Sequence, residues 1–147
     1  MQAIQFQKLH PQAVIPRRAT PGSAGMDLTA CLEQPVVLAP GERTMISTGL
    51  ALALPTEEWV ALVYARSGLA VRHGICLSNS AGVVDSDYRG ELKVGLCNLG
   101  SEPYTIEPGE RIAQLVITPV LLPPIEEVSA LDETERGTGG FGSTGKQ

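Results

Sequence analysis

Polar side chains suited to acid–base chemistry and hydrogen-bonded recognition concentrate in residues 79–90, between two apolar runs. Asp85 directly follows two valines, so we expect it at the end of a strand, a rigid position suited to a general base. Tyr88 offers a flat ring for a sugar or base, and Asn79 carries the donor and acceptor that reading an amide-like pyrimidine edge requires. The alternative interpretation is a β-hairpin loop whose aspartate and asparagine side chains bond to their own backbone.

A second cluster, residues 65–70, places an arginine at the expected start of a helix. The pattern predicts a helix from Ser67 to Arg72, with Ser67 as the N-cap and Gly74 as the terminating residue. Arg66 precedes this helix, where free N–H groups and the helix dipole favour an anion. Ser67 therefore has two open interpretations, a simple helix cap and a phosphate ligand.

The segment from Arg136 to Gln147 carries five of the chain's 16 glycines. Serial glycines let backbone N–H groups converge on an anion. The spacing of Gly137, Gly139 and Gly142 formally matches a dinucleotide fingerprint, and Gly140 to Lys146 falls one residue short of a P-loop. Both motifs need a helix after the glycines, and no helix-forming run follows here. We expect this segment either to be disordered or to close over a ligand that the rest of the protein holds.

Two further segments, residues 24–30 and 109–115, carry isolated charged side chains. A buried Asp27 that bonds to turn amides would explain the first. In the second, strand alternation places Arg111 on the face opposite Gln114, where it would pair with a surface carboxylate. The two histidines lie far apart in the sequence, and we assign neither to a metal.

Composition narrows the class of protein. A chain of 147 residues with 43% hydrophobic residues predicts one domain with a proper core. Nothing approaches about eighteen consecutive apolar residues, and the N-terminal residues lack an apolar stretch, so we expect neither a membrane span nor a signal peptide. Three cysteines without CxxC spacing predict reduced, half-buried thiols in a cytoplasmic protein. A net charge of −5 argues against binding to nucleic acid.

The elements that must position these side chains are predicted to be strands. Short β-branched runs alternate with Gly and Pro turn signals, which is typical of an all-β sandwich or barrel. The Pro-Gly-Glu-Arg sequences at Pro40 and Pro108 each suit a type II turn. After residue 123 the chain becomes acidic and then glycine-rich, so we expect a core over 1–123 and an arm over 124–147. The expected strands cover 36–38, 45–54, 59–64, 92–97 and 112–122.

Five segments, in order, resemble the motifs of the trimeric deoxyuridine triphosphatases. They are AGMDLTA (24–30), ARSGLA (65–70), NSAGVVDSDYRGEL (79–92), GERIAQL (109–115) and RGTGGFGSTG (136–145). The resemblance implies a distorted jelly-roll β-sandwich with one short helix and a flexible glycine-rich C-terminal arm. It also implies hydrolysis of dUTP to dUMP and pyrophosphate by in-line attack of water on the α-phosphorus, which limits dUTP and supplies dUMP for thymidylate synthesis.

The resemblance assigns roles to single residues. Asp85 matches the general base that activates the attacking water. The residues that match contacts to uracil and deoxyribose are Asn79, Gly82, Val83, Val84, Tyr88, Lys93 and Phe141. Those that match contacts to the phosphates are Arg66, Ser67, Gly68, Gln114, Arg136, Gly142, Ser143 and Thr144. The cofactor implied is Mg²⁺, held chiefly by phosphate oxygens and water, with Asp27 reaching it at most through a water molecule.

The family forms homotrimers whose active sites are shared between subunits, and a polar arm has a natural destination on a neighbouring subunit. Two other classes of function stay open at this point. One is a deaminase of dCTP with the same fold, although such enzymes usually carry Glu where this chain has Asp85. The other is a non-catalytic nucleotide-binding jelly roll, because this fold also serves as a scaffold.

Overall fold

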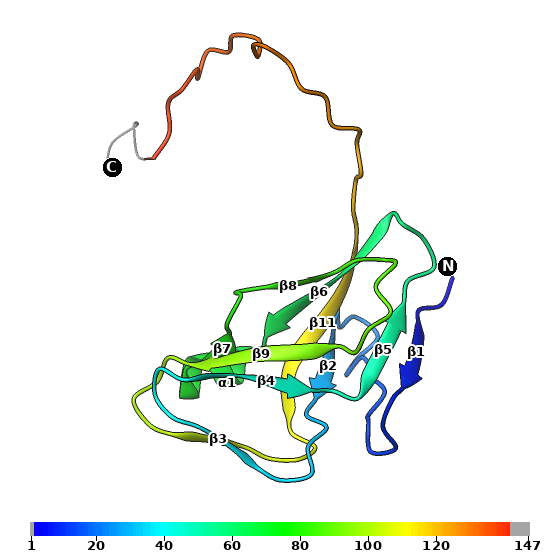
Figure 1. The fold of residues 1–147 in the computed structure, drawn as a ribbon, viewed down its shortest axis with the longest axis vertical. Helices are drawn as coiled ribbons and strands as arrows, with labels where there is room; N and C mark the ends of the chain where they lie inside the picture. Colours follow the sequence, from blue (N-terminus) through cyan, green and yellow to red (C-terminus); the bar gives the residue numbers. More distant parts are fainter. Residues whose placement is uncertain (1, 142–147) are drawn as a thin grey trace.

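The computed structural model describes residues 2–141, and over that range the chain is built from short strands and one short helix (Figure 1). This confirms the predicted all-β class, a distorted jelly-roll sandwich. In chain order the elements are β1 (Gln5–Lys8), β2 (Gly25–Thr29), β3 (Val36–Leu38), β4 (Arg43–Ser47), β5 (Leu50–Ala53), β6 (Trp59–Ala65), α1 (Ser67–His73), β7 (Ile75–Leu77), β8 (Gly82–Val84), β9 (Lys93–Asn98), β10 (Tyr104–Ile106) and β11 (Arg111–Pro119).

Two sheets matter for the candidate site. The larger has the strand order β2-β11-β6-β8, and the smaller has the order β4-β9-β7. Two-stranded pairs, β1 with β5 and β10 with β3, complete the molecule. Every pairing is antiparallel. Since β7 and β9 lie in one sheet and β8 in the other, the chain crosses between the sheets twice within residues 77–93.

The core lies where the apolar faces of these strands meet. Leu28 of β2, Leu96 of β9 and Leu115 of β11 are buried to 1% exposure or less. Each such side chain contributes about 1.5–3 kcal/mol when it leaves water. The alternation of buried and exposed residues along β9 is regular, so its period of two places Lys93 outward and Val94 inward. Packing of β9 in the core thus fixes the strand from which Lys93, a predicted site residue, projects.

The two predicted type II turns are confirmed. Gly41 and Gly109 have φ values of 80° and 81°, a left-handed conformation that glycine adopts without steric cost. The amide of Glu42 donates to the carbonyl of Ala39, and that of Glu110 donates to the carbonyl of Glu107. Each glutamate carboxylate also accepts a hydrogen bond from the first residue of its own turn. The second turn leads directly into β11, which carries Gln114.

The single strand predicted over 45–54 is interrupted. β4 ends at Ser47 and β5 begins at Leu50, because Gly49 has a φ of 66° that a continuous strand does not accommodate. The buried Thr48 hydroxyl donates to the carbonyl of Leu92 at 2.6 Å. This bend lets β4 pair with β9 while β5 pairs with β1.

The predicted helix forms with a different start. α1 covers Ser67–His73 and ends at Gly74, as expected, but its N-cap is Arg66 and no side chain caps it. The N-cap assignment of Ser67 is therefore wrong. Arg66 keeps the extended backbone of β6, with φ −81° and ψ 129°, so Ser67 already lies in the first helical turn. Its hydroxyl makes no capping bond, and the other interpretation, a phosphate ligand, stays a prediction.

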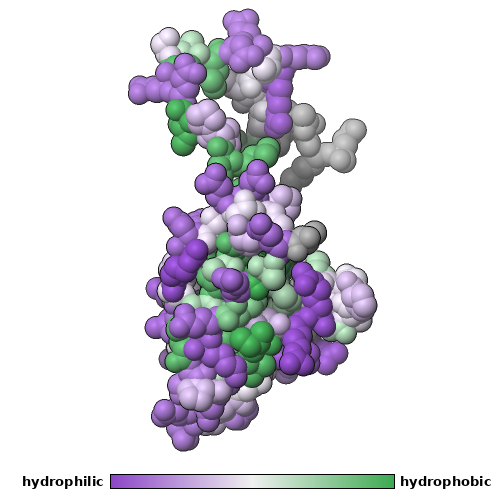
Figure 2. All heavy atoms as spheres, turned by 90° about the vertical axis from the view of Figure 1, so that its right-hand side faces the viewer, coloured by the Kyte–Doolittle hydropathy of each residue, from purple (hydrophilic) through white to green (hydrophobic). Residues whose placement is uncertain are grey.

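The segment after β11 leaves the body of the molecule (Figure 1). The amide of Val120 still donates to the carbonyl of Glu58. From there to the last described residue, the backbone and side-chain hydrogen bonds found join arm residues only to one another. Figure 2 shows apolar side chains exposed along this arm, and they include Leu122, Ile125, Leu131 and Phe141.

The three cysteines are free and partly buried, as predicted. No helix in the described part of the chain has the length and apolar character needed to cross a membrane.

Tyr104 should ionise later than an ordinary tyrosine. Burial first, then the hydrogen bond to Glu110 and its negative charge, raise the pKa of Tyr104 from 10.0 to about 12. Because the folded-state pKa lies above the unfolded value, its stabilising contribution is complete below about pH 10 and is lost as the pH rises toward 12. An ultraviolet absorbance titration should show one of the three tyrosines ionising late, and Tyr104→Phe should remove that step. Simultaneous ionisation of all three would contradict this prediction.

Candidate active site

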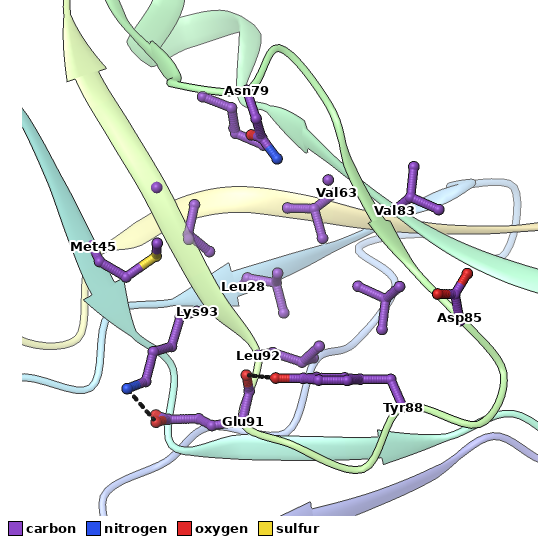
Figure 3. Close-up of a pocket in the computed structure, with 15 residues that line it drawn as sticks. Leu28, Met45, Val63, Asn79, Val83, Asp85, Tyr88, Glu91, Leu92 and Lys93 are labelled. Carbon is purple, nitrogen blue, oxygen red and sulfur yellow. Dashed lines mark hydrogen bonds and ion pairs between the residues drawn. The ribbon is translucent and has the colours of Figure 1, made fainter.

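A groove of about 550 Å³ opens between the two main sheets. Its floor is apolar, with Leu28, Leu92 and Val94 each at most 3% exposed. Polar side chains stand around this floor (Figure 3). All but Phe141 of the residues predicted to contact the base, the sugar and the attacking water line this one groove: Asn79, Gly82, Val83, Val84, Asp85, Tyr88 and Lys93. The fold therefore gathers side chains from β8, β9 and the loops beside them into a single site.

Residues 79–90 do not form the β-hairpin loop that was the alternative interpretation. β8 pairs with β6, with Val84 opposite Ala61, whereas the next strand, β9, pairs with β4 and β7. The reason is that β6 offers β8 an open sheet edge, while β9 is already paired on both sides. Asp85 follows β8 directly and is exposed at the groove, so its predicted position at a strand end is confirmed.

The loop after β8 is held by the backbone and by one arginine. The amide of Tyr88 donates to the carbonyl of Asp85 at 3.2 Å. The guanidinium of Arg89 donates to the carbonyls of Ser86 and Tyr88 at 2.7 and 2.9 Å. Arg89 thus fixes the turn that joins the aspartate to the tyrosine. Sequence reasoning missed this role, since nothing in the sequence distinguishes a guanidinium that caps loop carbonyls from one in solvent.

Glu91 organises the opposite wall of the groove and was also missed. One carboxylate oxygen accepts the amide of Gly49 at 2.9 Å, and the other lies 3.6 Å from Nζ of Lys93. The backbone carbonyl of Glu91 accepts the Tyr88 hydroxyl at 3.1 Å. These contacts join Tyr88 and Lys93 through one residue (Figure 3). The negative charge of Glu91 also offsets the positive charge of Lys93, which leaves less net positive charge in this groove to attract a phosphate.

A separate polar cluster surrounds Asp27. Its Oδ1 lies 2.9 Å from Nε of Arg66, and its Oδ2 lies 2.9 Å from Nη1 of Arg111. Arg66 also donates to the backbone carbonyl of Arg111 at 3.1 Å. Asp27 is partly exposed and binds two arginines, so the expectation of a buried aspartate bonded to turn amides is wrong. The carboxylate instead orients two guanidinium groups, whose remaining N–H donors can bind an anion.

Arg111 lies on the same face of β11 as Gln114, contrary to the prediction from strict alternation. The register shifts between Arg111 and Ala113, and Ile112 and Ala113 are both buried, which marks a β-bulge. Gln114 lies opposite Asp27 in the register, the residue that Arg111 contacts. The bulge therefore brings Arg111 into the cluster around Asp27.

The two clusters do not share a pocket within one chain. Arg66, Ser67, Gly68 and Gln114 are absent from the lining of the groove, whose one cation among the described residues is Lys93. Arg136 donates to the carbonyl of Gly139 in its own arm, and Phe141 is exposed. Gly142, Ser143 and Thr144 lie outside the described residues.

Metal ligands are sparse in the described residues. No group of three or more His, Cys, Asp or Glu side chains is placed to hold a metal ion there. Both carboxylate oxygens of Asp27 already contact arginines. The donor set therefore offers no carboxylate cage of the kind that binds Mg²⁺ without help from a substrate.

The family model for dUTPase matches residues 11–145 of this chain. The deoxyuridine 5'-triphosphate nucleotidohydrolase of Neisseria gonorrhoeae is 54% identical over 131 residues, which cover 89% of this chain and 87% of the relative. This chain belongs to the dUTPase family. A relative of the same name from Sodalis glossinidius is 50% identical over 133 residues, covering 90% of this chain and 88% of that protein. The predicted family and its enzyme class, dUTP diphosphatase, are confirmed.

Solved dUTPase structures share the fold. A mutant dUTPase of Staphylococcus bacteriophage 80alpha with dUpNHpp has a TM-score of 0.88 and 29% identity, covering 99% of this chain and 100% of that chain. A mutant dUTPase from phage phi11 of S. aureus, described with a structural Mg(II) ion, has a TM-score of 0.78 and 26% identity, covering 88% and 98%. Membership of the dUTPase family thus accounts for the fold as a whole.

Proposed function

We propose that this protein hydrolyses dUTP to dUMP and pyrophosphate, with Asp85 as the general base. The observation that carries the proposal is the position of Asp85 at the end of β8, exposed beside an apolar groove that Asn79 and Tyr88 also line. The related phage enzyme with dUpNHpp, a deoxyuridine nucleotide, supports a deoxyuridine nucleotide in this groove. By this reaction the enzyme would limit dUTP and supply dUMP for thymidylate synthesis.

The uracil ring would be read by backbone as well as by side chain. β8 is the last strand of its sheet among the described strands, so the N–H and C=O groups of its free edge can bond to a ligand. Asn79 adds an amide with both a donor and an acceptor. This arrangement fits the alternating acceptors and donor of uracil. Cytosine has reversed polarity at N3 and at position 4, and thymine carries a methyl group that the groove would exclude.

The Tyr88 ring would pack against the deoxyribose. It lines the groove between Asp85 and Glu91, and its hydroxyl is held by the carbonyl of Glu91. A ring fixed in this way leaves no space for a 2′-hydroxyl group, which is how the site would select deoxynucleotides. Lys93 would complete the contacts of the nucleoside from the neighbouring strand.

Catalysis would consist of one proton transfer and in-line displacement at the α-phosphorus. The Asp85 carboxylate takes a proton from a water molecule as that water attacks the phosphorus, and pyrophosphate leaves on the opposite side. Mg²⁺, when bound by the phosphate oxygens and water, would supply charge stabilisation. Asp27 would reach the ion at most through a water molecule. Its direct task would be to orient Arg66 toward the phosphates.

A complete site would draw on more than one chain. The groove that holds the nucleoside has no described arginine, whereas Arg66, Ser67, Gly68 and Gln114 stand together elsewhere on the chain. A triphosphate needs those cations and donors, so we infer that a second subunit contributes them. The arm over 124–147, beyond the core over 1–123, would add Arg136, Phe141, Gly142, Ser143 and Thr144. A homotrimer with three shared sites satisfies these requirements.

The three free cysteines support a reducing compartment such as the cytoplasm.

Pyrophosphate release from separate dUTP, dCTP, dTTP and UTP samples, with and without Mg²⁺, tests the proposal. Of the four nucleotides, we expect only dUTP to release pyrophosphate at a substantial rate. That rate should be higher with Mg²⁺ than without it. Ammonia release from dCTP would favour the deaminase alternative and overturn the proposal. Absence of turnover with every nucleotide would favour a binding protein.

Gly25→Ala should impair phosphate binding at little cost in stability. A Cβ at residue 25 would collide with the Oε1 atom of Gln114 and lie 3.4 Å from its Cδ. Because this amide is the end of a flexible side chain, it can move away and lose its 3.0 Å hydrogen bond to the carbonyl of Ala65. We expect about a tenfold rise in KM for dUTP with an unchanged melting temperature. An unchanged KM would show that Gln114 does not contact substrate.

A further inference from the structure

Gly90 packs directly against the Tyr88 ring and leaves no space there for a side chain. A Cβ built on Gly90 would lie 2.6 Å from Cζ and 3.0 Å from Cε2 of Tyr88, and it would also collide with the hydroxyl oxygen. Separations below 3.0 Å are essentially never seen for real Cβ atoms. The ring therefore occupies the volume that any other residue at position 90 would fill.

The backbone at position 90 does not itself require glycine. Left-handed φ values occur at other glycines, such as Gly41 and Gly74, and Gly90 is not among them. Alanine can therefore adopt the backbone conformation of Gly90 without strain. The constraint comes from the neighbouring ring.

A side chain at position 90 would displace the Tyr88 ring more easily than it would displace the loop backbone. The loop backbone is fixed by the Tyr88–Asp85 hydrogen bond and by both carbonyl contacts of Arg89. The Tyr88 side chain, by contrast, is 45% exposed and is held at its tip by one hydrogen bond to Glu91. Rotation of the ring is thus the available response to a new methyl group.

We propose that Gly90 is a positioning residue that sets the place of the Tyr88 ring and, through it, the discrimination between deoxyribose and ribose. This inference rests on the proposed function, in which that ring packs against the sugar. Gly90 is not expected to touch substrate. Displacement of the ring would remove the packing on C2′ of dUTP. The kcat/KM for dUTP would therefore fall more than the kcat/KM for UTP.

The test compares kcat and KM for dUTP and UTP in four variants. They are Gly90→Ala, Tyr88→Ala, the double variant and the matched control Gly22→Ala. Gly22 has open space around its Cβ position and no left-handed φ. We expect Gly90→Ala to lower the ratio of kcat/KM for dUTP to that for UTP by about tenfold, mainly through KM for dUTP. Gly22→Ala should retain the wild-type ratio.

The double variant separates a positioning role from a general structural one. Once Tyr88 is replaced by alanine, the additional Gly90→Ala change should leave the ratio unchanged, because there is no ring to displace. Two results would overturn the inference. One is a dUTP-to-UTP ratio of kcat/KM that Gly90→Ala does not change. The other is an equal fall of that ratio when Gly90→Ala is introduced into the wild type and into Tyr88→Ala. If Gly90→Ala alone fails to fold, recovery of thermal unfolding in the double variant supports the collision, and failure to recover overturns it.

The wild-type protein distinguishes this inference from the proposed function. No dUTP turnover in the wild type would mean that the proposed function has failed. Wild-type turnover with a ratio that Gly90→Ala does not change would mean that only the inference has failed.

Discussion

Asp85→Asn is expected to lower kcat for dUTP by about 10³-fold while nucleotide binding is largely retained. The substitution removes the carboxylate proposed to accept the proton from the attacking water and keeps the shape of the side chain. Because Asp85 is exposed at the end of β8, the loss of its charge should leave the melting temperature unchanged. Steady-state pyrophosphate release measures kcat, and calorimetric titration with dUpNHpp measures binding.

Asp87→Asn is the matched control. It removes the same charge two residues further along the same loop, from an exposed side chain that does not line the groove. Its kcat should stay near the wild-type value. Near-normal turnover by Asp85→Asn would rule out this aspartate as the base and leave the groove without a proton acceptor in the proposed place.

Deletion of residues 136–147 is expected to abolish most turnover and leave the core folded. The described part of the arm adds no hydrogen bond to the core of its own chain after Val120, so the thermal unfolding of the core should not change. The loss of Arg136 and Phe141 would expose the substrate to water and misalign it, at a cost of about 10²-fold or more in kcat. Retention of the full kcat by the truncated protein would exclude a role for the arm in closing the site.

Single substitutions can separate the contribution of Phe141 from that of the arm as a whole. Phe141→Ala should raise KM for dUTP if the ring stacks on uracil. Leu131→Ala is the control, because Leu131 is 84% exposed in the same arm and has no assigned contact. Equal effects of the two changes would indicate a loss of general arm packing and not a specific contact.

The sequence predicts strands that carry a continuous apolar run, and it misses a strand whose side chains are mostly exposed. The runs over 36–38 and 59–64 nearly coincide with β3 and β6. β1 was missed because an edge strand with mostly exposed residues carries no apolar pattern. The two valines before Asp85 predict the end of β8 but not its pairing with β6, since only the folded chain creates that sheet edge.

For the candidate site, residue types were predictable and contacts were not. Asp85 and Asn79 stand out by chemistry and by their place beside apolar runs, and both line the groove. The side of the strand that Arg111 occupies depends on a bulge, which strict alternation cannot anticipate. Glu91 lies within the matching segment 79–92, but the sequence assigns it no role, because its importance lies in three simultaneous contacts that only the folded chain creates.

Because the chain crosses between the two sheets twice within residues 77–93, the packing between the sheets sets the geometry of the proposed site. Asn79 follows a strand of one sheet, whereas Asp85 follows a strand of the other. The separation between Asn79, the proposed reader of the base, and Asp85, the proposed proton acceptor, therefore depends on how the two layers pack on each other. Leu28, fully buried under the groove, acts as a spacer between them. A bound nucleotide would in turn fasten the layers together and should slow amide hydrogen exchange in both sheets.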